Sequence, residues 1–397
     1  MDHIAYQDRL RAVLMNREAA FPDTEFDRRC LALDRHLDMA GLDAVLITHP
    51  ADIYYLTGYN TFEVSVYTGL LYQSGRRVLQ VPSIETGPAV ACARCEEIIG
   101  YPWEGPGEIL GPLADTLASM GSTIGLDLWG AGLRSGIVDG LKARLPDHRF
   151  VDASGLLAPV RLVKSDLEIA CLERSARITE IGIAAARAAV SAGVTDNEVA
   201  AAASDAMLTA GTEFMSMQPI VVAGLRSSII HTNHRRFAIA EGEPVFIEVG
   251  AAYERYTAPL MHTLVAGSQG PDSRMLQVAR MCRTLYETLI NAMVPGHTFA
   301  EAAAKADTEL APLAGDIFFS GVYGYSVGAQ FPPSWVEGTG FIARGQETPF
   351  EENMVFHLPL CLRIPGLWGM GFSETVRVGP SGGVALTRNS WVLQQSD

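Results

Sequence analysis

Residues 245–263 read VFIEVGAAYERYTAPLMHT, and this stretch decides the fold of the second half of the chain. An apolar run ends in an acid, Glu248, and is followed by a glycine turn, an aromatic-rich hairpin and a second strand-like run. An acid buried in such a strand is costly unless it has a partner, so Glu248 is expected to be functional or ion-paired. Eleven residues later stands Pro259, whose ring offers no ligand atom. The stretch predicts a strand hairpin with the acid Glu248 in its first strand.

The length and charge of the chain indicate a globular enzyme with two domains. It has 397 residues, which is too long for one ordinary core, and a formal net charge of -15. Because phosphate recognition needs a basic surface, this charge argues against a nucleic-acid or anionic-membrane partner. The first residues lack the pattern of a signal peptide, and no uncharged apolar run reaches the roughly 18 residues that a spanning helix needs. We therefore expect a cytoplasmic protein.

The cysteines do not predict a metal centre. They are Cys30, Cys92, Cys95, Cys171, Cys282 and Cys361. Only Cys92 and Cys95 are close in sequence, and a structural zinc site would need a second such pair. Buried free thiols are the better interpretation.

The pattern of helices and strands changes near residue 155. Strand and helix patterns alternate in residues 1–155, which predicts a mixed α/β domain. Long helices and strand-like runs in residues 156–397 predict an α+β domain with curved antiparallel strands. Capping-box patterns mark three helix starts at the pairs Ser165 and Glu168, Thr195 and Glu198, and Thr298 and Glu301. The expected strands are QPIVVAG, VFIEVG, LMHTLVAG, VFHLPLCLR and SETVRVG.

Four segments together suggest a family. They are LVKSDLEIACLERSARIT (162–179), the Glu248 hairpin, GYSVG (324–328) and SETVRV (373–378). Their order and spacing resemble those of the creatinase/Xaa-Pro aminopeptidase family (M24), and the resemblance covers nearly the whole chain. It implies a pita-bread catalytic domain after a smaller α/β creatinase-type domain, and a homodimer.

The resemblance allows the family's five metal-ligand positions to be followed. In chain order they hold Glu248, Pro259, Tyr325, Pro359 or its neighbour Leu360, and Glu374. Divalent ions need roughly four to six donors each, so two carboxylates cannot hold a metal pair. We therefore expect no metal and no other cofactor. A single ion held by Glu248, Glu374 and nearby histidines is the alternative.

The remaining polar residues predict a metal-free site. In the creatinase branch, which works without metal, the catalytic histidine lies eleven residues before the glycine of a G-D turn, and that count from Gly242 reaches His231. The glycines around Tyr325 predict a tight turn that exposes its hydroxyl, and Glu374 has Arg377 as an alternative, structural partner. The expected substrate-binding residues are His234, Tyr256, His262, Trp335 and His357. Structural roles are the alternative for the three histidines among them.

The stretch GYSVGAQFPPSW (324–335) narrows the resemblance. Creatinases keep a histidine in this turn, whereas a tyrosine followed by Pro332, Pro333 and Trp335 is similar to the ectoine hydrolases. This implies a metal-independent hydrolase that cleaves a non-peptide C–N bond of a small amidine or guanidino compound, with ectoine opened to N-acetyl-diaminobutyrate. FHLPLCLRIPG (356–366) departs from the ectoine hydrolase pattern and leaves the substrate open.

The residues suggest a mechanism and leave three alternatives. Glu248 would attack the amidine carbon or hold the cation while water attacks, and His231 would transfer the proton. Tyr325 would donate a hydrogen bond to developing charge, and Glu374 would balance the amidinium or set the histidine tautomer. The alternatives are a creatinase-like amidinohydrolase with another substrate, a metal-dependent Xaa-Pro peptidase or lyase, and a non-catalytic binding protein of the same fold.

Overall fold

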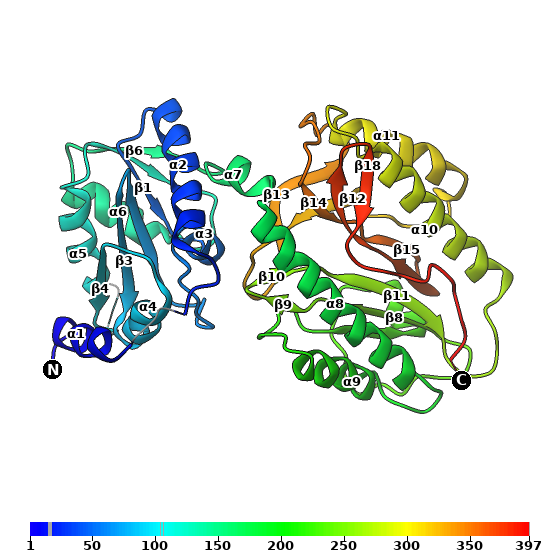
Figure 1. The fold of residues 1–397 in the computed structure, drawn as a ribbon. Helices are drawn as coiled ribbons and strands as arrows, with labels where there is room; N and C mark the ends of the chain where they lie inside the picture. The colour runs from blue at the N-terminus through cyan, green and yellow to red at the C-terminus, as the bar shows by residue number, and fades with distance from the viewer. Residues whose placement is uncertain (15–17, 104, 106, 397) are drawn as a thin grey trace. The chain divides into compact units, whose positions relative to one another are not determined.

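The computed structural model describes residues 1–14, 18–103, 105 and 107–396, which form two compact units, Met1–Val160 and Arg161–Asp397 (Figure 1). The predicted boundary at 155/156 lies just before this division, and helix α7 (Ala158–Leu162) crosses it. In the described part of the chain, no helix has the length and apolarity that spanning a membrane requires.

The first unit is built on one six-stranded mixed sheet. The strands are β1 (Ala44–Ile47), β2 (Gly69–Gln73), β3 (Arg76–Pro82), β4 (Glu97–Tyr101), β5 (Thr123–Leu126) and β6 (Arg149–Asp152). Their order across the sheet is β4-β3-β2-β1-β5-β6, with antiparallel pairs on both sides of β2 and parallel pairs elsewhere. The helices are α1 (His3–Val13), α2 (Asp23–Ala40), α3 (Pro50–Thr57), α4 (Thr86–Cys92), α5 (Gly107–Leu117) and α6 (Ser135–Arg144). This is the predicted α/β domain.

The described strands of the second unit pair with one another in antiparallel fashion, and Val265 adds one isolated parallel bridge to Gln395. A three-stranded sheet has the order β11 (Leu260–Val265), β8 (Pro244–Val249) and β7 (Ile220–Ala223). A five-stranded sheet has the order β13 (Val336–Ala343), β12 (Val322–Val327), β14 (Val355–His357), β17 (Thr375–Gly379) and β18 (Gly382–Ala385). Two short ribbons pair β9 (Ala252–Tyr253) with β10 (Tyr256–Thr257), and β15 (Leu360–Ile364) with β16 (Trp368–Phe372).

Four long helices cover these sheets, and their starts confirm the predicted capping boxes. The helices are α8 (Asp166–Ala189), α9 (Asp196–Thr209), α10 (Ser273–Ala292) and α11 (Phe299–Leu310). At α8, α9 and α11 the Ser or Thr side chain and the Glu three residues later cap each other's backbone as predicted. Figure 1 shows α8 and α9 beside β8 and β11, whereas α10 and α11 lie near β12, β14 and β18.

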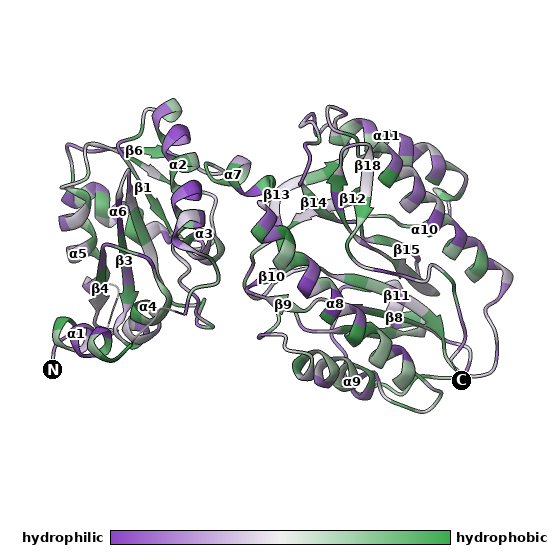
Figure 2. Ribbon diagram, in the orientation of Figure 1, coloured by the Kyte–Doolittle hydropathy of each residue, from purple (hydrophilic) through white to green (hydrophobic). Residues whose placement is uncertain are grey.

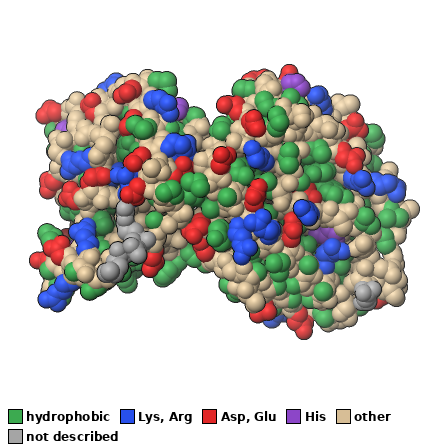
Figure 3. Space-filling model, viewed as in Figure 1, with side chains coloured by type: hydrophobic (Ala, Val, Ile, Leu, Met, Phe, Trp, Pro, Cys, Tyr) green, Lys and Arg blue, Asp and Glu red, His purple; other side chains and the backbone are tan. Residues whose placement is uncertain are grey.

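The apolar side chains pack between these helices and strands. Val199 and Met207 of α9 join Ile247, Val249 and Leu264 in one buried cluster. Figure 2 shows that the helices carry both hydrophilic and hydrophobic residues along their length. Figure 3 shows acidic and basic side chains interspersed over the visible surface. The α+β class that the sequence predicts is the observed one.

The run VFHLPLCLR is not the single strand that its composition predicts. It divides into β14 and β15, which belong to different sheets, and Leu358 and Pro359 lie at the break. Proline has no backbone N–H to donate to a strand ladder, so it favours the end of a strand. The break turns the chain from the five-stranded sheet to the β15–β16 ribbon.

Candidate active site

Glu248 lies in the middle strand of the three-stranded sheet and is only 3% exposed. Its directly opposed neighbours are Ile220 on β7 and Met261 on β11, and opposed residues share one face of a sheet. No side chain in the described ranges forms a hydrogen bond or ion pair with its carboxylate. Burial therefore raises the pKa of Glu248 to about 8.

Tyr325 and Cys361 lie close enough to Glu248 to sense its charge. Burial, followed by the charge of Glu248, raises the pKa of both the phenol and the thiol well above their usual values. The Cys361 Sγ lies 3.3 Å from the Sδ of Met261. The phenol of Tyr325 and the thiol of Cys361 are therefore the titratable neighbours of this carboxylate, and no cation of the described residues shifts its pKa.

Tyr325 is a strand residue, and the predicted tight turn at GYSVG is wrong. It lies in β12, paired with Phe341 of β13 and His357 of β14, with irregular register on both sides of the Gly324–Tyr325 pair. Such irregularities redirect side chains, which the flanking glycines make possible. The tyrosine remains partly exposed.

A chain of hydrogen bonds connects Tyr325 to buried groups. The Trp335 indole Nε1–H donates to the Tyr325 hydroxyl at 2.9 Å, and that hydroxyl lies 2.7 Å from Nδ1 of His357. The Nε2 of His357 lies 2.7 Å from the Ser373 hydroxyl, which also accepts the backbone N–H of Met261 at 2.6 Å. His357 is fully buried, and burial lowers its pKa to about 3, so its ring is neutral.

Glu374 is also buried, but its carboxylate is fully occupied. It accepts hydrogen bonds from the Thr387 hydroxyl, the Asn389 backbone N–H at 2.6 Å and the Trp391 indole at 3.2 Å. Burial nevertheless raises its pKa to about 7, against the effect of these donors. The alternative pairing with Arg377 does not occur, because that arginine donates to Asn353. Glu374 thus fastens the C-terminal segment.

His262 lies on the opposite face of β11 from Glu248. Side chains alternate along a strand, and the preceding residue, Met261, is the one opposed to Glu248. The Nδ1 of His262 lies 2.8 Å from Asn389 Oδ1, its ring meets Phe372 edge-on, and burial lowers its pKa to about 4. This geometry gives His262 a packing role and no shared face with Glu248.

Tyr256 and His234 are also held by protein groups. The Tyr256 hydroxyl donates to Glu168 of α8 at 2.9 Å, and the ring is fully buried. The Nδ1 of His234 lies 3.2 Å from the carbonyl oxygen of Pro219. Their expected role in substrate binding stays a prediction without a contact that favours it.

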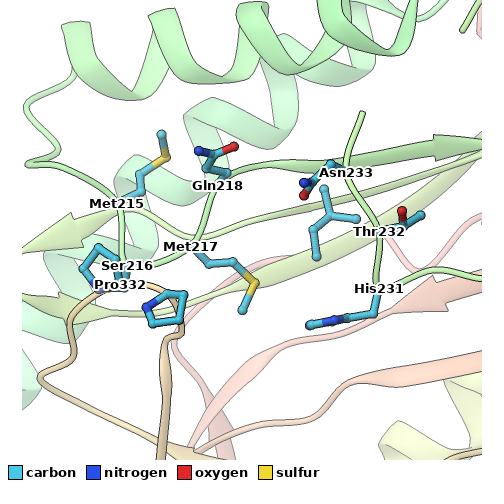
Figure 4. A pocket seen from close by; sticks show the side chains of 10 residues that line it. Met215, Ser216, Met217, Gln218, His231, Thr232, Asn233 and Pro332 are labelled. Atoms are coloured by element: carbon cyan, nitrogen blue, oxygen red, sulfur yellow. The ribbon is translucent and has the colours of Figure 1, made fainter. Parts of the chain in front are cut away.

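A pocket of about 390 Å³ opens beside the three-stranded sheet (Figure 4). Its lining includes Met215, Ser216, Met217, Gln218, Ile220, His231, Thr232, Asn233, Pro332 and Pro333. Glu248 and Tyr325 are not among the lining residues, but Ile220, which is directly opposed to Glu248 on β7, is one of them. His231 is exposed at this pocket, and the loop after Phe331 forms another part of the wall.

Arg255 holds the pocket walls together and was not expected from the sequence. It occupies the turn between β9 and β10 with a positive φ of 64°, yet its side chain is fully buried. The guanidinium stacks on Phe214 and Phe331 and donates to the Ser216 hydroxyl and the Gln330 carbonyl. The sequence feature that could have indicated this role is the position of Arg255 in the aromatic-rich segment YERY, because arginine stacks on aromatic rings.

The side chains present do not fit the metal pair that the resemblance implies. Of the five ligand positions, Glu248 and Glu374 supply carboxylates, and the oxygens of Glu374 already accept three donors. Pro259 and Pro359 offer only backbone carbonyls, which accept from Thr375 and Cys361. Among the described residues, no group of three or more His, Cys, Asp or Glu side chains is placed to hold an ion.

Comparison with known proteins identifies the family. Residues 170–380 match the model of metallopeptidase family M24, and residues 29–163 match the creatinase/prolidase N-terminal domain. A Xaa-Pro dipeptidase of Pyrococcus horikoshii is 24% identical over 89% of this chain and 94% of the relative. The ectoine hydrolase of Halomonas elongata is 23% identical over 91% and 95%.

Solved structures agree on the fold. The prolidase of Pyrococcus horikoshii superposes with a TM-score of 0.80 at 22% identity, covering 92% of this chain and all of that one. A prolidase from Thermococcus sibiricus gives a TM-score of 0.82 at 20% identity, covering 93% and 99%. The chain therefore belongs to metallopeptidase family M24, a family of hydrolases, and combines its pita-bread domain with a creatinase-type N-terminal domain.

Proposed function

We propose that this M24 member is a metal-independent hydrolase that cleaves a non-peptide C–N bond of a small cationic compound. The observation that carries the proposal is Glu248, a buried carboxylate with no cation beside it and a phenol nearby. A buried carboxylate is costly without a partner, and a bound cation would supply that partner. A pocket of about 390 Å³ suits a small molecule.

A cyclic amidinium fits this site chemically. Its charge is spread over an N–C–N unit, so one carboxylate neutralises it and the central carbon remains open to attack. Either Glu248 forms a bond to that carbon, or Glu248 holds the cation while His231 takes a proton from an attacking water. In both routes the C–N bond then breaks and the leaving nitrogen gains a proton. In the covalent route a water then adds to the same carbon, and its bond to Glu248 breaks to release the product and the free carboxylate. Trapping a covalent adduct on Glu248 by mass spectrometry would separate the routes.

Ectoine is the first substrate to test. The support is the similarity of Tyr325, Pro332, Pro333 and Trp335 to the ectoine hydrolase pattern, together with the Halomonas relative. Purified, chelator-treated protein should open the ring of ectoine or hydroxyectoine in proton NMR spectra. Creatine serves as the matched guanidino compound. Silence on all three compounds would overturn the ectoine assignment.

A metal-dependent Xaa-Pro dipeptidase is the second candidate, because three similar relatives carry that description. This function predicts hydrolysis of Xaa-Pro dipeptides that appears on adding Mn²⁺ or Co²⁺ and disappears with chelator. The unsuitable donor set argues for the metal-free reaction. A pure binding protein would leave every compound intact, and Glu248→Ala would then change affinity alone.

A further inference from the structure

The hydrogen bonds from Trp335 to Ser373 determine where each proton lies. At the two ends, the Trp335 indole N–H and the Met261 backbone N–H can only donate. Between them, the hydroxyls of Tyr325 and Ser373 and the ring of His357 each bring one hydrogen, since the buried ring is neutral. Three hydrogens therefore have to be placed.

One arrangement leaves a buried hydrogen without an acceptor. If the ring proton of His357 is on Nε2, it donates to Ser373, and Tyr325 donates to Nδ1. Ser373 then receives donors from both His357 and Met261, and its own hydrogen has no acceptor among the described residues. Ser373 is fully buried, so this arrangement carries the cost of an unpaired polar hydrogen.

The other arrangement uses every buried hydrogen. Ser373 donates to Nε2 of His357, and the ring proton on Nδ1 is donated to the Tyr325 oxygen. That oxygen also accepts from Trp335, so it is surrounded by two donors. The only hydrogen left over belongs to Tyr325, which is partly exposed and senses the charge of Glu248.

We infer that Ser373 and His357 are positioning residues. Ser373 holds His357 in its Nδ1–H tautomer, and the Nδ1–H of His357 makes the Tyr325 hydroxyl an obligate donor toward the face of Glu248. His357 then has no nitrogen free for substrate, unlike the substrate-binding role expected from the sequence. Sequence spacing does not reveal this hydrogen-bond chain, because its members come from separate segments, and Tyr325 meets His357 through the pairing of β12 with β14.

The donor has a specific use in the proposed reaction. The ring nitrogens of a protonated cyclic amidine carry hydrogens and offer no free lone pair. When a nucleophile adds to the carbon, the C=N π pair moves onto one nitrogen as a lone pair, which accepts a hydrogen bond. Tyr325 therefore stabilises the addition state more than bound substrate, which raises kcat and leaves KM nearly unchanged. This consequence rests on the proposed function, whereas the tautomer does not.

The tautomer is measured without any substrate. Full-length protein labelled with [15N]histidine gives long-range 1H–15N correlations, and the signal of His357 is assigned by its loss in His357→Gln. A signal with a protonated Nδ1 and an unprotonated Nε2 is expected. An Nε2–H tautomer or a doubly protonated ring would overturn the inference.

Kinetics test the consequence once a substrate is found. Ser373→Ala should lower kcat about tenfold or more, with KM changed less than about threefold, and Ser373→Thr should restore most of the rate. Ser326→Ala is the matched control. Ser326 is also buried, but it hydrogen-bonds Thr339 and takes no part in the hydrogen bonds from Trp335 to Ser373.

A double variant tests whether Ser373 acts through Tyr325. In a Tyr325→Phe background, Ser373→Ala should have little further effect on kcat. Additive losses would contradict action through Tyr325. If no compound is turned over, the proposed function fails and the NMR result still decides the tautomer.

Discussion

Glu248 and Glu374 are two buried glutamates at retained ligand positions of the family, and their surroundings differ completely. Glu248 has no hydrogen-bond partner within the described ranges, whereas Glu374 accepts three donors from residues 387–391. Burial raises the pKa of both carboxyls, to about 8 and about 7. Glu374 is therefore held by the C-terminal segment, whereas we propose that the carboxyl group of Glu248 is left for a ligand.

The largest expected effect is the loss of turnover when Glu248 is substituted. Glu248→Gln keeps the shape of the side chain and removes its charge, so turnover should fall by roughly a thousandfold or more. Below about pH 8 the melting temperature should stay nearly equal, because Glu248 is protonated there and Gln replaces one neutral side chain with another. Steady-state kinetics and thermal unfolding of the same preparation test this. A large loss of stability with retained turnover would contradict the assignment.

Glu374→Ala should show the opposite pattern. It leaves the Thr387 hydroxyl, the Asn389 N–H and the Trp391 indole without their acceptor, which should cost about 3 kcal/mol of unfolding free energy. Urea unfolding measures the loss. Substrate affinity of the folded fraction should change little. A selective loss of kcat at unchanged stability would return Glu374 to the catalytic role expected from the sequence.

The dependence of the free energy of unfolding on pH tests the raised pKa of Glu248. In the folded state Glu248 ionises near pH 8 instead of its ordinary 4.5, so the folded protein holds this proton longer than the unfolded chain. The contribution of protonated Glu248 to the stability of the fold is therefore fully present below pH 4.5, and it is lost as the pH rises through about 8. Between about pH 5.5 and pH 7.5 the free energy of unfolding should fall by about 2 kcal/mol through Glu248. Glu248→Gln should remove this part of the slope, and an unchanged slope would refute the raised pKa.

The smallest effect concerns Asn389, which connects the two regions. Its side-chain amide donates to the carbonyls of Met261 and Ser373 and faces Nδ1 of His262. Asn389→Ala should cost about 1 kcal/mol of stability and reduce turnover less than about threefold. Parallel urea unfolding and rate measurements check both numbers. A loss of turnover as large as that of Glu248→Gln would show that the regions act as one site.

Local patterns in the sequence predicted the parts of the fold that depend on neighbouring residues. The capping pairs at Ser165, Thr195 and Thr298 begin helices as expected, because the bonds that form them span three residues. The strand that carries Glu248 was predicted by its continuous apolar character. The same pattern left open whether Glu248 would be ion-paired, and in the structure burial is the cause of its raised pKa.

Long-range contacts were beyond the reach of these patterns. The donors to Glu374 come from the C-terminal segment, and His357 meets Tyr325 through strand pairing. The glycines beside Tyr325 suggested a turn, but the five-stranded sheet imposed a strand on them. His262 was assigned to the site by type and proximity in sequence, and strand alternation put it on the other face.

The central claim is that Glu248 supports hydrolysis without a metal ion, and its most direct test is a metal titration of turnover. Chelator-stripped protein is assayed with ectoine while Mn²⁺ is added back in steps, with Glu248→Gln as the inactive control. A metal-free reaction would open the ring at a rate that does not depend on Mn²⁺. A rate that starts at zero and saturates with added Mn²⁺ would contradict it.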